Sequence, residues 1–280
     1  MRWDSSDRRS DNIEDRRGIS VGRGAAVGGG SVVIALVLAL LGAPKELVNS
    51  VLSGGGGPGP AVERPIDPAQ EPTMDMLRVV LADTEDVWSQ LLGQRYQPPR
   101  LTAFAEAVES ACGFATSAVG PFYCPADRKV YLDLTFFDEL DRKFGAPGDF
   151  AQAYVVAHEI GHHVQTLTGI SEKVHAARRQ VSETEGNALS VRQELQADCY
   201  AGVWGHHAAR TKNRLVAGDL EEGLQAATAI GDDTLQKRGR GHVVPESFTH
   251  GSAAQRVAWF KRGFESGRPQ DCDTFSADRI

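Results

Sequence analysis

The 280-residue chain is poor in cysteine and has no excess of basic residues. No two of its four cysteines are spaced as Cys-x-x-Cys, so a metal site built from thiolates is not expected. Its 30 Lys and Arg residues are outnumbered by 37 Asp and Glu residues, and the net charge of -7 gives no reason to expect nucleic-acid binding. No internal repeat is visible. With 41% hydrophobic and 24% charged residues, the composition is that of an ordinary globular protein.

The motif His158-Glu-Ile-Gly-His162 is the most informative segment of the chain. Residues four apart lie on one face of a helix, so both imidazoles can reach one metal ion. Glu159 lies one step round the helix, where it can handle a proton at an open coordination position. The Pro-Gly-Asp run at 147–149 predicts the start of this helix and Gly169 its end. The pattern is typical of a zinc hydrolase, and the alternative is a pair of core histidines satisfied by hydrogen bonds.

Two histidines do not complete a catalytic zinc site, which commonly has three protein ligands and one water. A third histidine six residues beyond the motif would indicate a metzincin, but that position is Thr168. Glu194 and Asp198 lie four apart on a second helix that looks buried. In the His-His-Glu class of zinc peptidases a glutamate on a second helix binds zinc. We therefore expect Glu194 to be the third ligand and Asp198 to hold a ligand histidine, with a solvated acidic pair as the alternative.

Five segments resemble the bacterial family of neutral zinc metallopeptidases, which are anchored single-pass proteins. They are Ser110–Pro125, His158–His163, Glu194–Cys199, Ala229–Asp233 and Phe248–Arg256. These segments cover most of the chain after the expected linker, and none of the family's key positions is altered. The resemblance implies gluzincin-like hydrolysis with Zn²⁺ as the cofactor, rather than a particular substrate.

A further likeness concerns the segment Phe248–Val257. It is similar to a His-then-Arg segment of the membrane zinc proteases that process prenylated proteins. By that likeness, His250 would donate a hydrogen bond to the oxyanion of the tetrahedral intermediate, as a second electrophile beside zinc. Arg256 would pair with a buried acid, either Asp198 or Asp232. The alternatives are a loop histidine and a surface cation.

The N-terminal quarter divides into three segments by composition. Residues 1–24 are polar and mixed in charge, which predicts a disordered tail. Residues 25–43 carry no charge and can span a bilayer, and no Ala-x-Ala ends the apolar run, so a retained transmembrane helix is favoured over a signal peptide. Arginines before this run place the N-terminus in the cytoplasm and the catalytic domain outside. Residues 44–72, rich in Gly and Pro, predict a linker.

The even number of cysteines supports an oxidising compartment. Cys112 and Cys124 flank a short turn, so we expect them to form one disulfide, and Cys199 and Cys272 to form the other by elimination. The second bridge would tie the C-terminal segment to the helix that carries Glu194. Four reduced thiols are the alternative.

These features predict a zincin-like domain over residues 73–273, predominantly helical α+β with a small sheet, preceded by one transmembrane helix and followed by a tail at 274–280. Strands are expected at 100–110 and 129–136, the latter either an edge strand for substrate pairing or an interior strand. A mobile loop near the site is expected at 237–241. Helices are expected at 73–92, 135–144, 148–167, 171–184, 188–209, 218–236 and 252–264.

The sequence as a whole predicts a membrane-anchored zinc metallopeptidase acting on a peptide or protein. His158, His162 and Glu194 would bind Zn²⁺, and Glu159 would be the general base. One alternative is a non-catalytic envelope module with structural zinc, which usually needs four protein ligands, and no convincing fourth ligand is visible. The other alternative is a hydrolase of a non-peptide amide. No oligomeric state is indicated.

Overall fold

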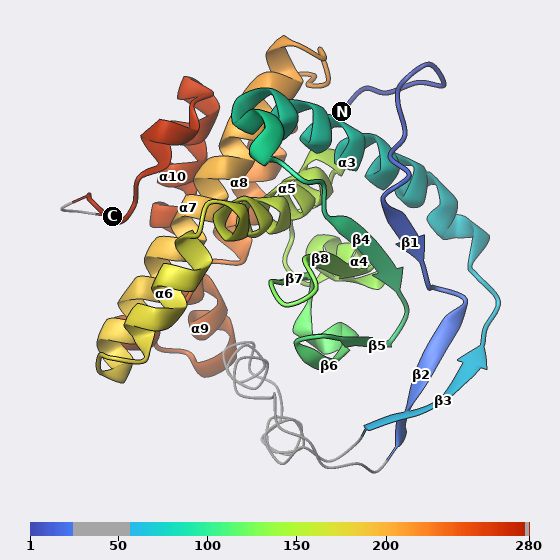
Figure 1. Ribbon diagram of the computed structural model, residues 1–280, viewed down its shortest axis with the longest axis horizontal. Coiled ribbons are helices and arrows are strands. Elements are labelled where there is room, and N and C mark those ends of the chain that lie inside the picture. Colours follow the sequence, from blue (N-terminus) through green and yellow to red (C-terminus); the bar gives the residue numbers. More distant parts are fainter. Residues whose placement is uncertain (25–56, 278–279) are drawn as a thin grey trace.

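Helices make up most of the computed structural model, which describes residues 1–24, 57–277 and 280 (Figure 1). The predominantly helical α+β class is confirmed. The helices are α3 (Glu71–Leu92), α4 (Thr135–Arg142), α5 (Asp149–Leu167), α6 (Ile170–Arg178), α7 (Glu183–Arg210), α8 (Asp219–Ala229), α9 (Asp232–Arg240) and α10 (Ala253–Ser266). Short 3-10 helices lie at Pro68–Gln70, Gly93–Arg95, Ser117–Val119, Pro245–Ser247 and Pro269–Cys272.

The strands form one four-stranded sheet and two small ribbons. They are β1 (Ile13–Asp15), β2 (Ile19–Gly24), β3 (Gly57–Glu63), β4 (Arg100–Phe104), β5 (Ala107–Ser110), β6 (Gly113–Thr116), β7 (Phe122–Cys124) and β8 (Lys129–Asp133). The main sheet has the order β1-β4-β8-β7, in which β1, β4 and β8 are parallel and β7 is an antiparallel edge strand. The ribbons pair β2 with β3 and β5 with β6.

Strand β8 is an interior strand of the main sheet. Val130 and Leu132 face the large core shared with the helices, whereas Tyr131 packs in a smaller cluster with residues of β5 and β6. This is the alternation expected of a strand that is buried on both faces. Because β4 and β7 occupy both of its edges, β8 has no free edge for a substrate, and the edge-strand hypothesis for 129–136 is wrong.

The helical layer is built around α5, which packs against α3, α7 and α8 (Figure 1). Helix α7 in turn packs along α10 with very little space between the two backbones. A Cβ atom added to Gly263 of α10 would overlap the carbonyl oxygen of Cys199, and one added to Gly202 of α7 would overlap that of Phe260. Glycine is therefore required at this crossing, which sets the distance between α7 and α10.

Most helix boundaries follow the periodicity of the sequence, with three differences. The predicted helix at 218–236 is two helices, because Gly231 separates the end of α8 from the start of α9. The predicted loop at 237–241 is instead mostly the last turn of α9. Helix α7 begins earlier than expected, since Ser182 forms a capping box with Glu185.

Both predicted disulfides are present. One joins Cys112 to Cys124 and the other joins Cys199 to Cys272. The second closes a loop of sequence separation 73 and fastens the C-terminal segment to α7, as expected. No described cysteine is free, so the alternative of reduced thiols is excluded.

Residues 1–24 are folded onto the domain, and their prediction as a disordered tail is wrong. Strand β1 extends the main sheet beside β4. Arg8 pairs with Glu85 at 2.8 Å, and Arg9 pairs with Asp75 at 2.7 Å, both acids lying on α3. The mixed charge that suggested disorder is therefore matched by acids elsewhere in the chain, which a reading of the local composition does not detect.

The predicted single-pass anchor is also corrected. Within residues 1–24, 57–277 and 280, no helix combines the length and apolar character needed to cross a membrane. The predicted span at 25–43 itself lies outside the described residues. Gly24 of β2 and Gly57 of β3 are paired, so both flanks of that segment belong to the same body. One membrane crossing would put them on opposite sides, and the predicted topology is therefore wrong. The middle of the predicted linker forms β3, and its end forms the 3-10 helix Pro68–Gln70 and the first residues of α3.

Candidate metal centre and its surroundings

Helix α5 carries two of the three predicted metal ligands. It begins at Asp149, directly after Gly148, whose φ is 112° and whose Cβ, if present, would overlap the carboxyl group of Glu222. An acid in the first turn is favoured by the helix dipole. Counted from this start, His158 and His162 fall on one face, and their ring centroids lie 4.8 Å apart. The spacing of the motif thus produces the expected pair.

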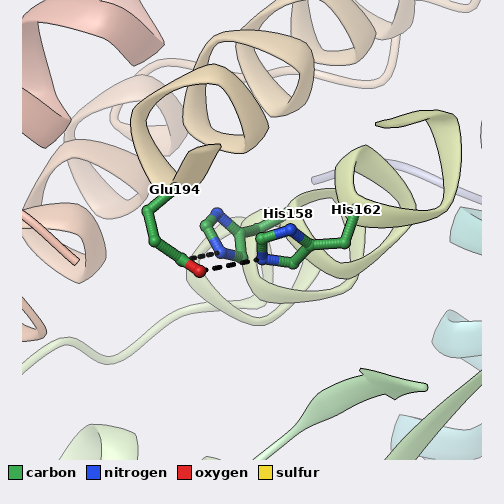
Figure 2. A group of neighbouring side chains, drawn as sticks. All are labelled: His158, His162 and Glu194. Carbon is green, nitrogen blue, oxygen red and sulfur yellow. Dashed lines mark hydrogen bonds and ion pairs between the residues drawn. The ribbon is translucent and has the colours of Figure 1, made fainter. Parts of the chain in front are cut away.

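Glu194 reaches these two histidines from α7, as Figure 2 shows. Its Oε2 lies 3.2 Å from Nε2 of His158, and its Oε1 lies 3.5 Å from Nε2 of His162. The helices can approach because Gly161 faces Ala197, where an added Cβ would lie 2.9 Å from the carbonyl oxygen. Each of the three side chains offers a ligand atom within 4.8 Å of the others. The structure therefore brings the predicted ligand set together.

The outer ring nitrogens of both histidines are held by acceptors. Nδ1 of His158 lies 2.8 Å from Oδ1 of Asp198, and Nδ1 of His162 lies 2.9 Å from Oε1 of Gln165. Because a carboxylate and an amide oxygen accept hydrogen bonds, each Nδ1 carries a proton, which leaves each Nε2 as the atom that would bind a metal ion at the meeting point. Two imidazoles and one carboxylate are a donor set that catalytic zinc sites use, with a coordination position left open. The residues present fit Zn²⁺.

Asp198 is fully buried and surrounded by hydrogen-bond donors. Arg256 donates from Nε to Oδ2 at 2.8 Å and from Nη2 to Oδ1 at 2.9 Å, and the hydroxyl of Tyr154 donates to Oδ1 at 2.6 Å. Burial favours the neutral acid, but the charge of Arg256 lowers the pKa of Asp198 to about 2. An ionised Asp198 therefore orients His158. Of the two acids considered for Arg256, its partner is Asp198.

The three candidate ligands affect one another's pKa. Burial opposes ionisation of Glu194, but His162 holds the pKa of Glu194 well below its usual range. Burial likewise opposes protonation of His162, but Glu194 raises the pKa of His162 to about 9. The pKa of His158 is raised despite its burial, through Asp198 and Glu194. A buried carboxylate beside two imidazoles thus attracts positive charge at their meeting point, and a divalent cation supplies such charge.

Glu159 follows His158 directly on α5 and is only 7% exposed. Among the residues that the structure describes, none forms a hydrogen bond or ion pair with its carboxyl group. Its negative charge contributes to the raised pKa of His162, so it lies near the ligands. A buried acid without a partner beside a metal centre is suited to accept and return a proton.

His250 lies in the segment before α10 and is not part of the ligand group. Its Nδ1 lies 3.2 Å from Oδ1 of Asp232. The next residue, Gly251, packs against α7, where an added Cβ would lie 3.2 Å from both Leu195 and Val191. These two residues are on either side of the glutamate ligand in the sequence. His250 therefore stands beside the metal centre.

Gln165 is a site residue that the sequence analysis did not identify. Its side-chain nitrogen donates to the carbonyl of Gln193 at 2.7 Å and to Oε1 of Gln196 at 3.1 Å. Gln196 donates in turn to the carbonyl of Cys272 at 2.9 Å. The orientation of His162 is thereby tied to α7 and to the second disulfide. The sequence does carry a signal for Gln165, because this amide lies about one helical turn after His162. In the same way Tyr154, which donates to Asp198, lies one turn before His158.

Among the described residues, one other acidic group is compact enough to hold a cation. Asp149, Asp219 and Glu222 meet near the starts of α5 and α8. The α-amino group of Met1 contacts both aspartates and supplies positive charge there. This group lies at the start of α5, whereas the histidine ligands lie further along the helix.

Comparisons with known proteins identify the family of the chain. A family model described as "Putative neutral zinc metallopeptidase" matches residues 1–275. The protein named "Uncharacterized protein YpfJ" of Escherichia coli (strain K12) is 46% identical over 287 residues, covering 98% of this chain and 99% of the relative. "Uncharacterized protein Rv2575" of Mycobacterium tuberculosis (strain ATCC 25618 / H37Rv) is 46% identical over 201 residues, covering 68% of this chain and 67% of the relative. No solved structure matches the chain.

Proposed function

The chain belongs to this family of neutral zinc metallopeptidases, and from that premise we propose that it hydrolyses peptide bonds at the centre formed by α5 and α7. The observation that carries the proposal is the convergence of His158, His162 and Glu194 within 4.8 Å. Each imidazole is held by an acceptor on its outer nitrogen, so the ligand atoms are oriented in advance. Three ligands are the number that catalytic zinc sites commonly use.

A bound Zn²⁺ would lower the pKa of water at its open position towards about 7 and polarise the scissile carbonyl. Glu159 takes a proton from the attacking water and returns it to the leaving amine. Its burial and its lack of a hydrogen-bonding partner among the described residues suit this exchange. His250 donates a hydrogen bond from Nε2 to the oxyanion that develops at the carbonyl.

Two alternatives remain as outcomes of a test. A structural zinc site would need a fourth protein ligand, but the ligand group in the described part of the chain contains three residues, and all four cysteines are in disulfides. Hydrolysis of a non-peptide amide would use the same residues with a different substrate. The disulfides are typical of proteins in oxidising compartments.

Glu159→Gln is the decisive substitution. It removes the proton acceptor and preserves the three ligands, so we expect one zinc per chain as in wild type and a loss of peptide hydrolysis of roughly 10²-fold or more. Zinc content is measured by atomic emission, and hydrolysis is measured with an unbiased peptide library. Glu194→Gln should lower zinc content instead, and Glu172→Gln on the exposed face of α6 should change neither property.

Each outcome separates the candidates. Hydrolysis by Glu159→Gln within tenfold of wild type would refute the assigned base. Zinc binding without cleavage of any peptide by wild type would favour either the non-catalytic envelope module with structural zinc or the hydrolase of a non-peptide amide. A panel of non-peptide amides then distinguishes these two.

A further inference from the structure

Asp232 is a buried acid that the proposed chemistry does not yet use. It is the first residue of α9 and is 0% exposed. One of its oxygens, Oδ2, accepts backbone N–H groups from three successive residues, Thr249 at 2.7 Å, His250 at 2.7 Å and Gly251 at 3.0 Å. The backbone N–H of Asp232 donates to the carbonyl of Gly251 at 2.9 Å. The segment around His250 is therefore wrapped around this single carboxylate.

The second oxygen of the carboxylate fixes the imidazole ring. Nδ1 of His250 lies 3.2 Å from Oδ1 of Asp232 and 3.1 Å from the hydroxyl oxygen of Thr249, and because the carboxylate can only accept, Nδ1 donates to it and the ring orientation is fixed. Nε2 projects from the opposite side of the ring and has no hydrogen-bonding partner among the described residues. The His250 side chain is 27% exposed, so a ligand can reach it. The charges of His250 and Glu194 also affect each other's pKa, which places the ring near the metal centre.

Tight packing holds Asp232 and its segment in place. A Cβ added to Gly231, just before Asp232, would overlap the backbone nitrogen of Ala253 at the start of α10. Gly251, with φ of 93°, packs against α7 on the other side. The acid and the histidine are therefore fixed between α7, α9 and α10, which is the rigid support that a catalytic donor requires.

We propose that Asp232 is the positioning residue of His250, and that the pair acts as a charged hydrogen-bond donor to the oxyanion. The inference rests on the proposed function, because the oxyanion belongs to that reaction. Asp232 accepts the Nδ1 proton and thereby stabilises the imidazolium form, in which Nε2 also carries a proton. Nε2–H donates to the oxyanion and keeps its proton throughout.

The pairing of Asp232 with His250 predicts how activity changes with pH. Burial opposes the charged form of His250, but Asp232 on α9 and Glu194 on α7 raise the pKa of His250, whereas Arg256 on α10 lowers it. The donor is present below the pKa of His250 and is lost as the pH rises through it. Removing the charge of Asp232 therefore moves the alkaline limit of activity to lower pH.

Asp232→Asn tests the inference, because asparagine keeps an oxygen for the backbone N–H groups but carries no charge. We expect kcat to fall at least about tenfold with KM changed less than about twofold, since the interaction is made in the transition state. The alkaline limb of the kcat profile should move to lower pH by about one unit. The matched control is Asp233→Asn, whose carboxylate accepts the backbone N–H of Ala253 at 2.8 Å and does not contact His250.

A second readout does not depend on activity. In zinc-loaded Glu159→Gln protein, NMR titration of the His250 ring should show a pKa about one unit lower when Asp232→Asn is added, and no change with Asp233→Asn. If wild type proves inactive on peptides but this shift is found, the proposed function fails and the pairing stands. An unchanged His250 pKa overturns the inference whatever the activity.

A double-mutant cycle covers the case in which Asp232→Asn merely disturbs the fold. In a His250→Ala background, Asp232→Asn should have little further effect on kcat, because the residue through which it acts is gone. An equal loss in both backgrounds would show that Asp232 acts through the structure of the segment alone, and this would also overturn the inference.

Discussion

His162 and His163 are identical neighbours in the sequence with opposite environments in the fold. His162 faces the metal centre, where Glu194 raises its pKa to about 9 despite burial. His163 points about 100° away round α5 and is 1% exposed. Its Nε2 donates to the carbonyl of Gln97 at 2.6 Å and its Nδ1 accepts from the hydroxyl of Tyr123. His163 is a neutral histidine that connects α5 to β7 and to the segment before β4.

The neutral state of His163 makes stability depend on pH. Burial lowers the pKa of His163 to about 4, below its ordinary value near 6.5. The contribution of neutral His163 to the free energy of unfolding is complete above the pKa that this residue has in the unfolded chain. It is lost as the pH falls from there through the pKa that His163 has in the folded protein. Between about pH 6.5 and 4 the loss should reach up to about 3 kcal/mol.

Urea unfolding of wild type and His163→Asn in EDTA measures this contribution. The free-energy difference between the two proteins should shrink as the pH falls across that range, because asparagine does not titrate. A difference that is constant with pH would contradict the neutral assignment of His163.

At the scale of elements, the metal centre depends on close contacts between helices. Gly161 lets α5 approach α7, which brings Glu194 to the two histidines. Gly202 and Gly263 let α7 approach α10, which brings Arg256 to Asp198. Each ligand position is therefore set by the separation of two helices as well as by its own sequence.

Gly263→Ala should separate α7 from α10. The added methyl group would overlap the backbone carbonyl of Cys199, and backbone atoms cannot move aside as a flexible side chain can. We expect a loss of about 1–3 kcal/mol in the free energy of unfolding, measured by urea denaturation.

The matched control is Gly186→Ala on α7. There an added Cβ would meet only the side chain of Arg178, at 3.8 Å. This substitution should be neutral or stabilise the protein by up to about 1 kcal/mol, because alanine favours the helix. Equal effects of the two substitutions would show that the crossing of α7 and α10 has room for a methyl group at position 263.

At the scale of the whole molecule, the N-terminal arm, residues 1–17, is part of the domain. The family model also matches from residue 1, so the arm belongs to the pattern that the family shares. Arg17 is 3% exposed and pairs with Asp15 and Glu71. Arg214 likewise pairs with Asp7 of the arm, at 2.7 Å. The arm and the helical domain therefore stabilise each other and lie on the same side of any membrane.

Hydrogen exchange followed by NMR tests the attachment of the arm. The amide of Ser10 donates to the carbonyl of Arg78 at 3.0 Å, and that of Arg16 donates to Ala103 at 2.7 Å. Both amides should exchange at least about 10³-fold more slowly than an unprotected amide, because they open only with the fold. The internal control is the exposed Asp11, which should exchange rapidly. Exchange of all three at the same fast rate would mean that the arm is detached.

The sequence by itself determined the parts of this protein that depend on local spacing. A period of 3.6 residues places His158 and His162 on one face, and Glu194 and Asp198 on one face of the next long helix. The choice of Glu194 as the third ligand also needed the chemistry of zinc, which favours a third protein ligand and an open position. The two same-face pairs are found in the structure because their members lie about one helical turn apart, whereas the meeting of Glu194 with the histidines depends on the packing of α5 against α7.

Only the tertiary structure decided which distant residues meet. The sequence could not choose between Asp198 and Asp232 as the partner of Arg256, nor show that Asp232 holds His250. It also suggested disorder for the N-terminal arm, since the acids that balance its arginines lie on α3 and elsewhere far along the chain. Contacts of this kind depend on how closely the helices and strands pack, and no local periodicity in the chain records that.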